Sequence, residues 1–172
     1  NQAFATTHQY DELDRRTHTF EEISSSVTAE TRFSYDANGN LSLVEYPEAR
    51  AGNDSSNIRE TVYDERDLAW LVVRAEGSAD VTTTSLAYDG DENLVEAVAA
   101  VEYLTETPPS STQGAQVTDM VYDGFGRLAK LIDAQGNASE YDYDAAGNLV
   151  SGTISGEVVD VVWADDTGPV LL

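Results

Sequence analysis

The sequence predicts an all-β protein in which antiparallel β-hairpin repeats form a curved, open sheet. Aspartate follows tyrosine at seven of the nine tyrosines, whereas random placement would give about one such pair. Clusters of Gly, Asn and Asp follow these pairs and predict turns between short strands. Stretches such as 68–75 and 157–164 are β-branched and aromatic, a composition that favours pleated sheet.

The best-preserved repeat indicates how the units are built. Tyr122 and Tyr143 lie 21 residues apart with a further turn between them, so one unit is a pair of strands of about six residues each. We expect hairpin turns near residues 11–15, 36–40, 64–67, 89–93, 123–127, 133–137 and 144–148. Loops 47–57 and 105–116 are rich in Pro, Ser, Gly and Asn and should lie outside the sheet.

These units fill the chain, so residues 1–172 are predicted to be a single repeat region. Residues 92–104 have a helical composition, but their position directly after a turn predicts a strand. No segment of the chain is predicted to be helical.

Each residue of the repeated motif has a predicted role in folding. In "YDAAGNL", Tyr143 ends a strand and packs on the sheet. Asp144 accepts backbone N–H groups of the turn, Gly147 supplies a positive φ, and Leu149 begins the return strand. The predicted structural motif residues are Tyr10, Asp11, Tyr35, Asp36, Gly39, Leu41, Tyr63, Asp64, Tyr88, Asp89, Leu94, Tyr122, Asp123, Gly126, Leu128, Tyr143, Asp144, Gly147 and Leu149.

Some copies depart from the motif at the glycine position. Asp14, Asp67 and Glu92 stand there, and side chains at positive φ are strained. We therefore expect looser or differently shaped turns at these three copies.

Charge and composition exclude several classes of function. The 32 acidic residues outnumber the 9 basic ones, for a net charge of −23, which disfavours nucleic acid and anionic membranes. Solubilisation or adaptation to salt explains the charge more simply than a site for cationic partners. The absence of cysteine removes disulfides and thiolate sites, and no apolar stretch is long enough for a membrane helix.

No residue is predicted to be catalytic or to bind metal, and no ligand-binding residue can be assigned. His8 and His18, the only histidines, lack a nucleophile at a recognisable spacing, so we expect no enzyme activity. No cofactor is expected.

Weak Ca²⁺ binding at acidic turns is possible in principle, because "DANGN" and "DGDEN" have oxygen-bearing side chains at their first, third and fifth positions. Both lack the later Gly and Glu of an EF-hand loop, which favours plain Asx turns. Tyr141 and Tyr143 share a strand face that could stack on sugars, although ladder packing is the simpler explanation.

The motifs "YDANGNL", "YDGFGRL" and "YDAAGNL", with "IDAQGNASEYDYD" between the last two, resemble the YD-repeat or Rhs-repeat family over roughly residues 8–155. The resemblance implies hairpin ribbons that spiral into a hollow shell. In bacterial Rhs proteins and Tc toxin C components the shell encloses a toxin domain, and in teneurins it carries adhesion modules. The family's self-cleaving core and C-terminal effector are not present in these residues, so neither activity is carried over.

The expected function is therefore structural: a non-catalytic segment in the wall of a large secreted or cell-surface Rhs/YD-repeat protein that encapsulates or presents a toxin or effector. The alternative is an extracellular adhesion or glycan-binding module. Expected partners are neighbouring repeats of the same chain or another copy and an enclosed toxin domain, without nucleic acid or membrane insertion. Because the chain begins with Asn1, we expect it to be part of a longer protein.

Overall fold

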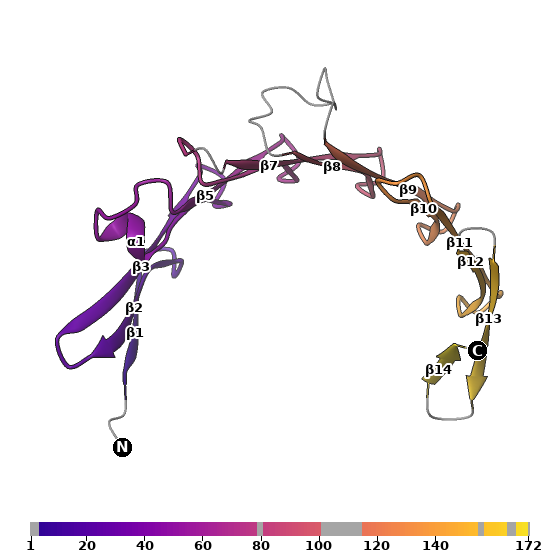
Figure 1. Ribbon diagram of the computed structural model, residues 1–172, viewed down its shortest axis with the longest axis horizontal. Coiled ribbons are helices and arrows are strands. Elements are labelled where there is room, and N and C mark those ends of the chain that lie inside the picture. Colours follow the sequence, from indigo (N-terminus) through magenta and orange to yellow (C-terminus); the bar gives the residue numbers. More distant parts are fainter. Residues whose placement is uncertain (1–3, 79–80, 101–114, 155–156, 165–167, 172) are drawn as a thin grey trace. The chain divides into compact units, whose positions relative to one another are not determined.

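The protein consists almost entirely of antiparallel β-hairpins, as predicted (Figure 1). The structure, a computed structural model, describes all residues except 1–3, 79–80, 101–114, 155–156, 165–167 and 172. The strands group into two compact units rather than one. The first unit runs to Ser85, and the second contains Leu86–Ala99 and the strands that follow.

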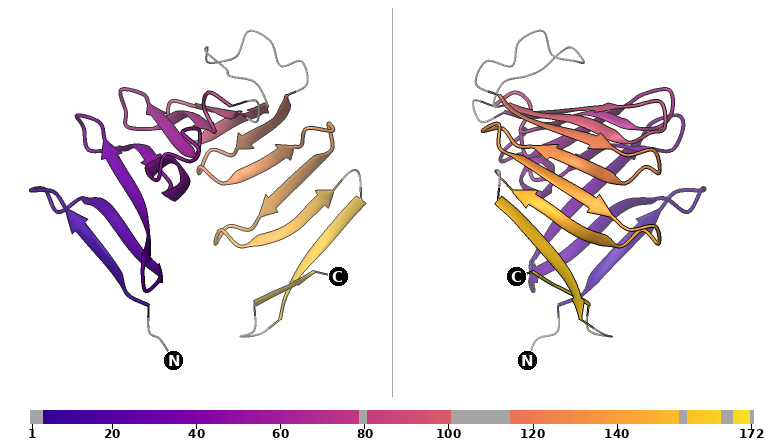
Figure 2. Two further views of the ribbon diagram at one scale, coloured as in Figure 1. Left: turned by 60° about the vertical axis from the view of Figure 1, so that its left-hand side comes forward. Right: turned by 90° about the vertical axis from the view of Figure 1, so that its right-hand side faces the viewer.

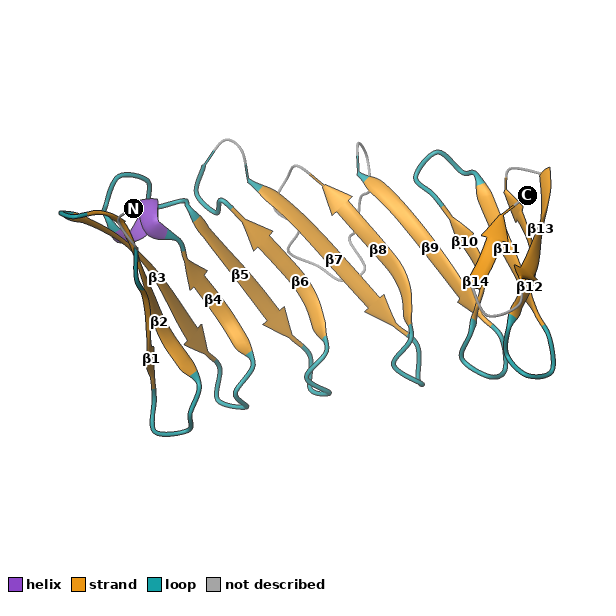
Figure 3. Ribbon diagram, turned by 90° about the horizontal axis from the view of Figure 1, so that it is seen from below, coloured by secondary structure: helices purple, strands orange, loops and turns teal. Residues whose placement is uncertain are grey.

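In the first unit, each strand pairs antiparallel with the next strand in the sequence. Its strands are β1 (Thr6–Tyr10), β2 (Arg16–Ser24), β3 (Val27–Tyr35), β4 (Leu41–Glu45), β5 (Ile58–Tyr63), β6 (Ala69–Arg74) and most of β7 (Thr82–Tyr88). Figure 3 shows these strands side by side in a single layer.

The second unit repeats this arrangement from the end of β7 onward. Its strands are β8 (Leu94–Ala100), β9 (Gln116–Tyr122), β10 (Leu128–Ile132), β11 (Ala138–Tyr143), β12 (Leu149–Ile154), β13 (Glu157–Ala164) and β14 (Gly168–Leu171). From β8 onward each strand again pairs antiparallel with its successor. Both units are therefore open antiparallel sheets built from consecutive hairpins.

The up-and-down order places the Tyr-Asp turns of each unit along one edge. We call the five-residue turns that follow tyrosine the YD loops: 11–15, 36–40, 64–68, 89–93, 123–127 and 144–148. Because successive hairpin connections alternate between edges, the first three share one edge of the first unit, and the last three share one edge of the second (Figures 2 and 3). Turn 133–137 lies at the opposite edge of the second unit.

A β-bulge follows the YD loop in five of the described hairpins. The pairing shifts by one residue immediately before the tyrosine, so Tyr143 is opposite Leu149 while Asp142 is opposite Ser151. The residues left over by this shift are Thr17, Ser42, Trp70, Ala129 and Val150. A bulge bends a strand and increases its twist, so the same distortion is built into each of these repeats.

Buried side chains are few because each sheet is a single layer. Leu71 and Val73 are opposite Ser85 and Thr83 respectively, and opposite residues share a face of the sheet. These four side chains are only 1–3% exposed. The core of the first unit therefore combines β-branched or aliphatic residues with small hydroxyl residues.

Three predictions about segments can be compared with the structure. Loop 47–57 begins with a one-turn helix, α1 (Pro47–Arg50), whose proline stands where a helix accepts it. Arg50 binds Glu30 and Glu45 at 3.2 and 3.5 Å, so ion pairs connect this loop to strands β3 and β4. Residues 94–100 of the ambiguous segment 92–104 are a strand, β8, as predicted, and 101–104 lie outside the described residues.

Most of the predicted loop 105–116 also lies outside the described residues, and its last residue, Gln116, already belongs to β9. None of the helices in the described part of the chain has the length and apolar character needed to cross a membrane.

Candidate functional site at the YD-loop edge

Each YD loop is closed by its aspartate, as in loop 144–148. Oδ1 of Asp144 accepts the backbone N–H groups of Ala146 and Asn148 at 2.9 and 2.8 Å, and Oδ2 accepts Nδ2 of Asn148 at 3.0 Å. Backbone bonds from Asp144 N to Asn148 O and from Gly147 N to Asp144 O complete the turn. This geometry is the Asx-type turn expected from the sequence.

The same bonds occur in every YD loop and in turn 133–137. In each, the aspartate Oδ1 accepts the N–H groups two and four residues on. Oδ2 binds the side chain of the closing residue, by which we mean the fifth residue of the loop, wherever that residue is Arg or Asn. Leu68 closes loop 64–68, and there Arg66 binds Asp64 Oδ2 instead, through Nε and Nη2.

These bonds act on the ionised carboxylate. The pKa of Asp144 lies below its ordinary value of 3.8 because the Asn148 side chain and backbone N–H groups favour the charged form. At Asp123, hydrogen bonds from the Arg127 side chain lower the pKa most. The pKa is also lowered by bonds of this kind at Asp11, Asp36, Asp64 and Asp133. The ionised carboxylates of these aspartates therefore stabilise the turns.

Loops without glycine at the fourth position keep this geometry, contrary to the expectation of looser turns. Asp14, Asp67 and Glu92 adopt φ of 58°, 62° and 67°, compared with 89° at Gly147. Their backbone N–H groups make the same bond to the aspartate carbonyl. Hydrogen bonds of the loop hold the backbone of these three residues in the left-handed region. The cost of a side chain at this position is therefore backbone strain rather than a different turn.

Three of the motif tyrosines connect their hairpin to the one before it. The hydroxyl of Tyr143 donates to the carbonyl of Leu128 at 2.9 Å, and Leu128 directly follows the preceding YD loop. Tyr35 donates to Arg16 at 2.9 Å and Tyr63 to Leu41 at 3.1 Å, again to the residue after the preceding loop. We call this contact region between consecutive YD loops a junction.

Arginine at the closing position strengthens the junction. The guanidinium of Arg127 binds Asp123 in its own loop and lies 4.5 Å from the ring centroid of Tyr143 in the next. Arg15 makes the equivalent contacts, with Asp11 and with Tyr35 at 4.7 Å. Each of these arginines combines a charged pair with a cation–π contact.

Glycine lies against the closing residue of the preceding loop, at ordinary van der Waals distance. A Cβ on Gly147 would lie 3.9 Å from Arg127 Nη1, and one on Gly39 would lie 3.5 Å from Arg15 Nη1. In loop 64–68 the equivalent residue is Asp67, whose Oδ1 accepts Nδ2 of Asn38 and of Asn40 at 2.9 and 2.7 Å. This junction therefore replaces glycine with a direct hydrogen bond between loops.

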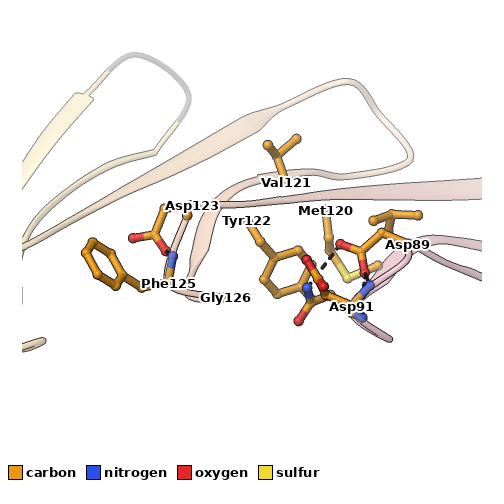
Figure 4. Close-up of a pocket in the computed structure, with 11 residues that line it drawn as sticks. Asp89, Asp91, Met120, Val121, Tyr122, Asp123, Phe125 and Gly126 are labelled. Atoms are coloured by element: carbon orange, nitrogen blue, oxygen red, sulfur yellow. Dashed lines mark hydrogen bonds between the residues drawn. The ribbon is translucent and has the colours of Figure 1, made fainter.

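Two pockets lie at successive junctions of the second unit. A pocket of about 790 Å³ lies between loops 89–93 and 123–127 and includes Asp91, Met120, Tyr122 and Phe125 (Figure 4). A second pocket of about 570 Å³ lies between loops 123–127 and 144–148 and includes Phe125, Arg127 and Tyr143. Phe125 is 86% exposed and borders both.

Both histidines contact side chains of the neighbouring strands. His8 Nδ1 lies 3.1 Å from Thr19 Oγ1, while His18 stacks on Phe20 and lies 3.7 Å from Glu30. No group of three or more His, Asp or Glu side chains in the described part of the chain could hold a metal ion. The described carboxylates of "DANGN" and "DGDEN" that open the loops instead accept backbone N–H groups.

The motif residues listed from the sequence did not include the closing residue. Its signal was present, because Arg or Asn closes five of the six YD loops. The bulge after five of these loops and the bond from tyrosine to the preceding hairpin left no separate mark in the sequence.

Hairpins with loops of one pattern, several of which contact the preceding loop, define a β-hairpin repeat protein. Residues 122–157 match the RHS Repeat family model. This segment includes the Asp123 loop, turn 133–137 and the Asp144 loop. The resemblance drawn from the YD motifs is therefore confirmed.

Solved structures similar to this chain include TcdB2-TccC3, with 13% identity and a TM-score of 0.28 over 97% of this chain and 14% of that chain. Another is the Photorhabdus luminescens Tc holotoxin pore, with 14% identity and a TM-score of 0.27 over 98% of this chain and 13% of that chain. This chain thus spans about one seventh of their length. No curated protein matches the chain.

Proposed function

We propose that this chain is a non-catalytic wall segment of a larger secreted or cell-surface YD-repeat protein, and that the wall encloses or presents a toxin or effector domain. The observation that supports this proposal best is the use of the motif residues. Tyr143, Asp144 and Gly147 each contact their own loop or the preceding hairpin, so the motif's chemistry serves repeat-to-repeat contact.

The environment of the tyrosines favours a wall over a sugar-binding face. Tyr35, Tyr63 and Tyr143 are half-buried and use their hydroxyls within the sheet. Two of these rings also lie under arginine. Stacking on sugars requires an open aromatic face, and these rings do not provide one. Tyr10, in the first hairpin, is 58% exposed.

A repeat wall also explains why the buried core is small. Units of a repeat protein gain stability from their neighbours rather than from one central core. The edge strands of an open sheet carry unpaired backbone groups that further strands can satisfy. Adjoining repeats, or another copy of the chain, are the partners that this architecture requires.

Protease protection in the natural polypeptide that carries this segment tests the proposal. The portion of that polypeptide enclosed by the wall should resist protease until the wall is opened. Gly147→Val, which places a β-branched side chain at a φ of 89°, should expose it. Gly124→Ala, at a glycine with no atom within 4 Å of the added Cβ, is the matched control and should leave protection intact. Equal cleavage in the unmodified protein and the Gly147→Val variant would contradict enclosure.

A further inference from the structure

The junction between loops 89–93 and 123–127 lacks the arginine that the next junction, between loops 123–127 and 144–148, has in Arg127. Lys130 is opposite Glu140, and continuing that register by three residues brings Arg127 opposite Tyr143. Glu96 is opposite Asp119, and the same continuation brings Asn93 opposite Tyr122. The two junctions are therefore equivalent in register, but Asn93 stands where the other has arginine.

Asn93 is too short to cover the tyrosine. Its Nδ2 is bound to Asp89 Oδ2 at 3.0 Å within its own loop, which keeps the amide near the loop. Beyond it lies the pocket of about 790 Å³, lined by Asp91, Met120, Tyr122 and Phe125 among others (Figure 4). At the next junction, the Arg127 guanidinium lies 4.5 Å from the ring centroid of Tyr143.

Two polar groups of this pocket have no partner among the described residues. The hydroxyl of Tyr122 makes no hydrogen bond there, whereas those of Tyr35, Tyr63 and Tyr143 do. Asp91 uses its backbone N–H within the loop, but its carboxylate is unpaired. The pocket therefore offers the ring of Tyr122 together with the carboxylate of Asp91. At the next junction the Arg127 guanidinium likewise meets a tyrosine ring and a carboxylate, those of Tyr143 and of Asp123 in its own loop.

We propose that this pocket binds an arginine side chain of another polypeptide. The carboxylate of Asp91 lines the pocket and is complementary to a cationic side chain. A planar guanidinium can stack on Tyr122 while donating to Asp91, and lysine lacks this combination of shape and donors. Met120 and Phe125, which also line the pocket, provide apolar surface for the methylenes of the arginine. The proposal goes beyond the wall function and does not depend on an enclosed domain.

Titration of the 172-residue chain with acetyl-arginine amide, followed by amide chemical shifts, tests the proposal. Shifts should concentrate at residues 91 and 120–126 and saturate. Acetyl-citrulline amide, which has nearly the same shape but no charge, should leave them unchanged. Asp91→Asn should weaken binding by about two- to fivefold, the effect of losing one exposed charge pair. Asp14→Asn, which removes the same charge from a loop of the first unit, should bind normally.

Asn93→Arg supplies the missing arginine from within the chain and provides a second test. Its guanidinium should bind Asp89 and cover Tyr122, as Arg127 does with Asp123 and Tyr143. This variant should be more thermostable and should no longer respond to acetyl-arginine amide. The proposal is overturned if the citrulline compound gives the same shifts, if Asp91→Asn binds as tightly as the unmodified chain, or if Asn93→Arg still binds the probe.

Discussion

The hydroxyl of Tyr143 donates a hydrogen bond of 2.9 Å to the carbonyl of Leu128 in the preceding hairpin. The Arg127 guanidinium lies over the same ring, so one tyrosine connects two repeats through both its edge and its face. The junction, as much as the hairpin, is thus a unit of stability in this protein.

Removal of the tyrosine hydroxyl should reveal this contribution. Tyr143→Phe should lower the free energy of unfolding by about 1 kcal/mol, the net worth of a half-buried hydrogen bond. Tyr122→Phe is the matched control, since its hydroxyl has no partner among the described residues, and it should have little effect. Urea unfolding followed by circular dichroism measures both. Equal losses in the two variants would show that the bond to Leu128 is not the cause.

Glycines of neighbouring YD loops should differ in their tolerance of a side chain. Gly147→Ala should destabilise the protein by about 1–2 kcal/mol, because alanine is disfavoured in the left-handed region and φ is 89° there. Gly124→Ala should be neutral or stabilise by up to about 1 kcal/mol by restricting the unfolded chain. Thermal unfolding of the two variants compares them directly, and a larger loss at Gly124 would refute the explanation.

Strain at the degenerate loops should be removable where the side chain has no other role. Glu92→Gly should raise the free energy of unfolding by about 1 kcal/mol by relieving a positive φ, which is 67°. Asp67→Gly should not give this gain, because the Asp67 carboxylate accepts bonds from Asn38 and Asn40. Chemical unfolding that showed the same gain for both variants would contradict a role for the Asp67 contacts.

Acid should weaken the YD loops. The pKa of Asp144 is held below 3.8 in the folded protein by Asn148 and other loop groups, so its contribution to stability is present above about pH 3.8 and lost as pH falls through the folded value. Asp144→Asn should therefore flatten the loss of stability below pH 4. Asp142→Asn removes an equal charge from a carboxylate that accepts a bond from the Ser151 hydroxyl. If it flattened the curve equally, net charge alone would explain the effect.

Glu60 should show the opposite pH dependence. Burial, together with a hydrogen bond and repulsion from the Glu76 carboxyl, raises the pKa of Glu60 above 4.5. The folded protein thus favours the protonated carboxyl, and this stability is present below pH 4.5 and lost as pH rises through the raised value. Glu60→Gln should stabilise the protein at pH 7 and give a smaller gain near pH 4. A gain independent of pH, measured by thermal unfolding, would exclude this pairing.

Local chemistry made much of this fold predictable. The aspartate, glycine and tyrosine of the motif act over a few residues, and turn chemistry of this kind is written directly in the sequence. The hairpin turn at Ser25–Ser26 and the turn at 75–78 were not predicted. Neither carries a Tyr-Asp pair, and the second has Ala75 as well as Gly77 at positive φ.

Contacts across the junction were not predictable in the same way. The register that brings Arg127 over Tyr143 depends on the bulge at Ala129 and on pairing between strands β10 and β11. Asp67 was expected to loosen its turn because of strain at positive φ. The bonds from Asn38 and Asn40 that Asp67 accepts come from the previous loop, 29 and 27 residues away, so the sequence did not reveal them. Sequence periodicity indicates which residues lie in loops but not which loop residues meet.

The closing residue of each YD loop belongs chemically to two hairpins at once. Arg127 and Gly147, or Asn40 and Asp67, are matched partners on either side of a boundary. A hairpin copied or deleted as a block would keep its own turn, but at its boundary one residue of such a pair would face an unmatched residue. Repeats of this kind should therefore accept insertions most readily at the opposite edge, where α1 and its loop already lengthen one connection. At the YD-loop edge, the two residues of each matched pair should change together.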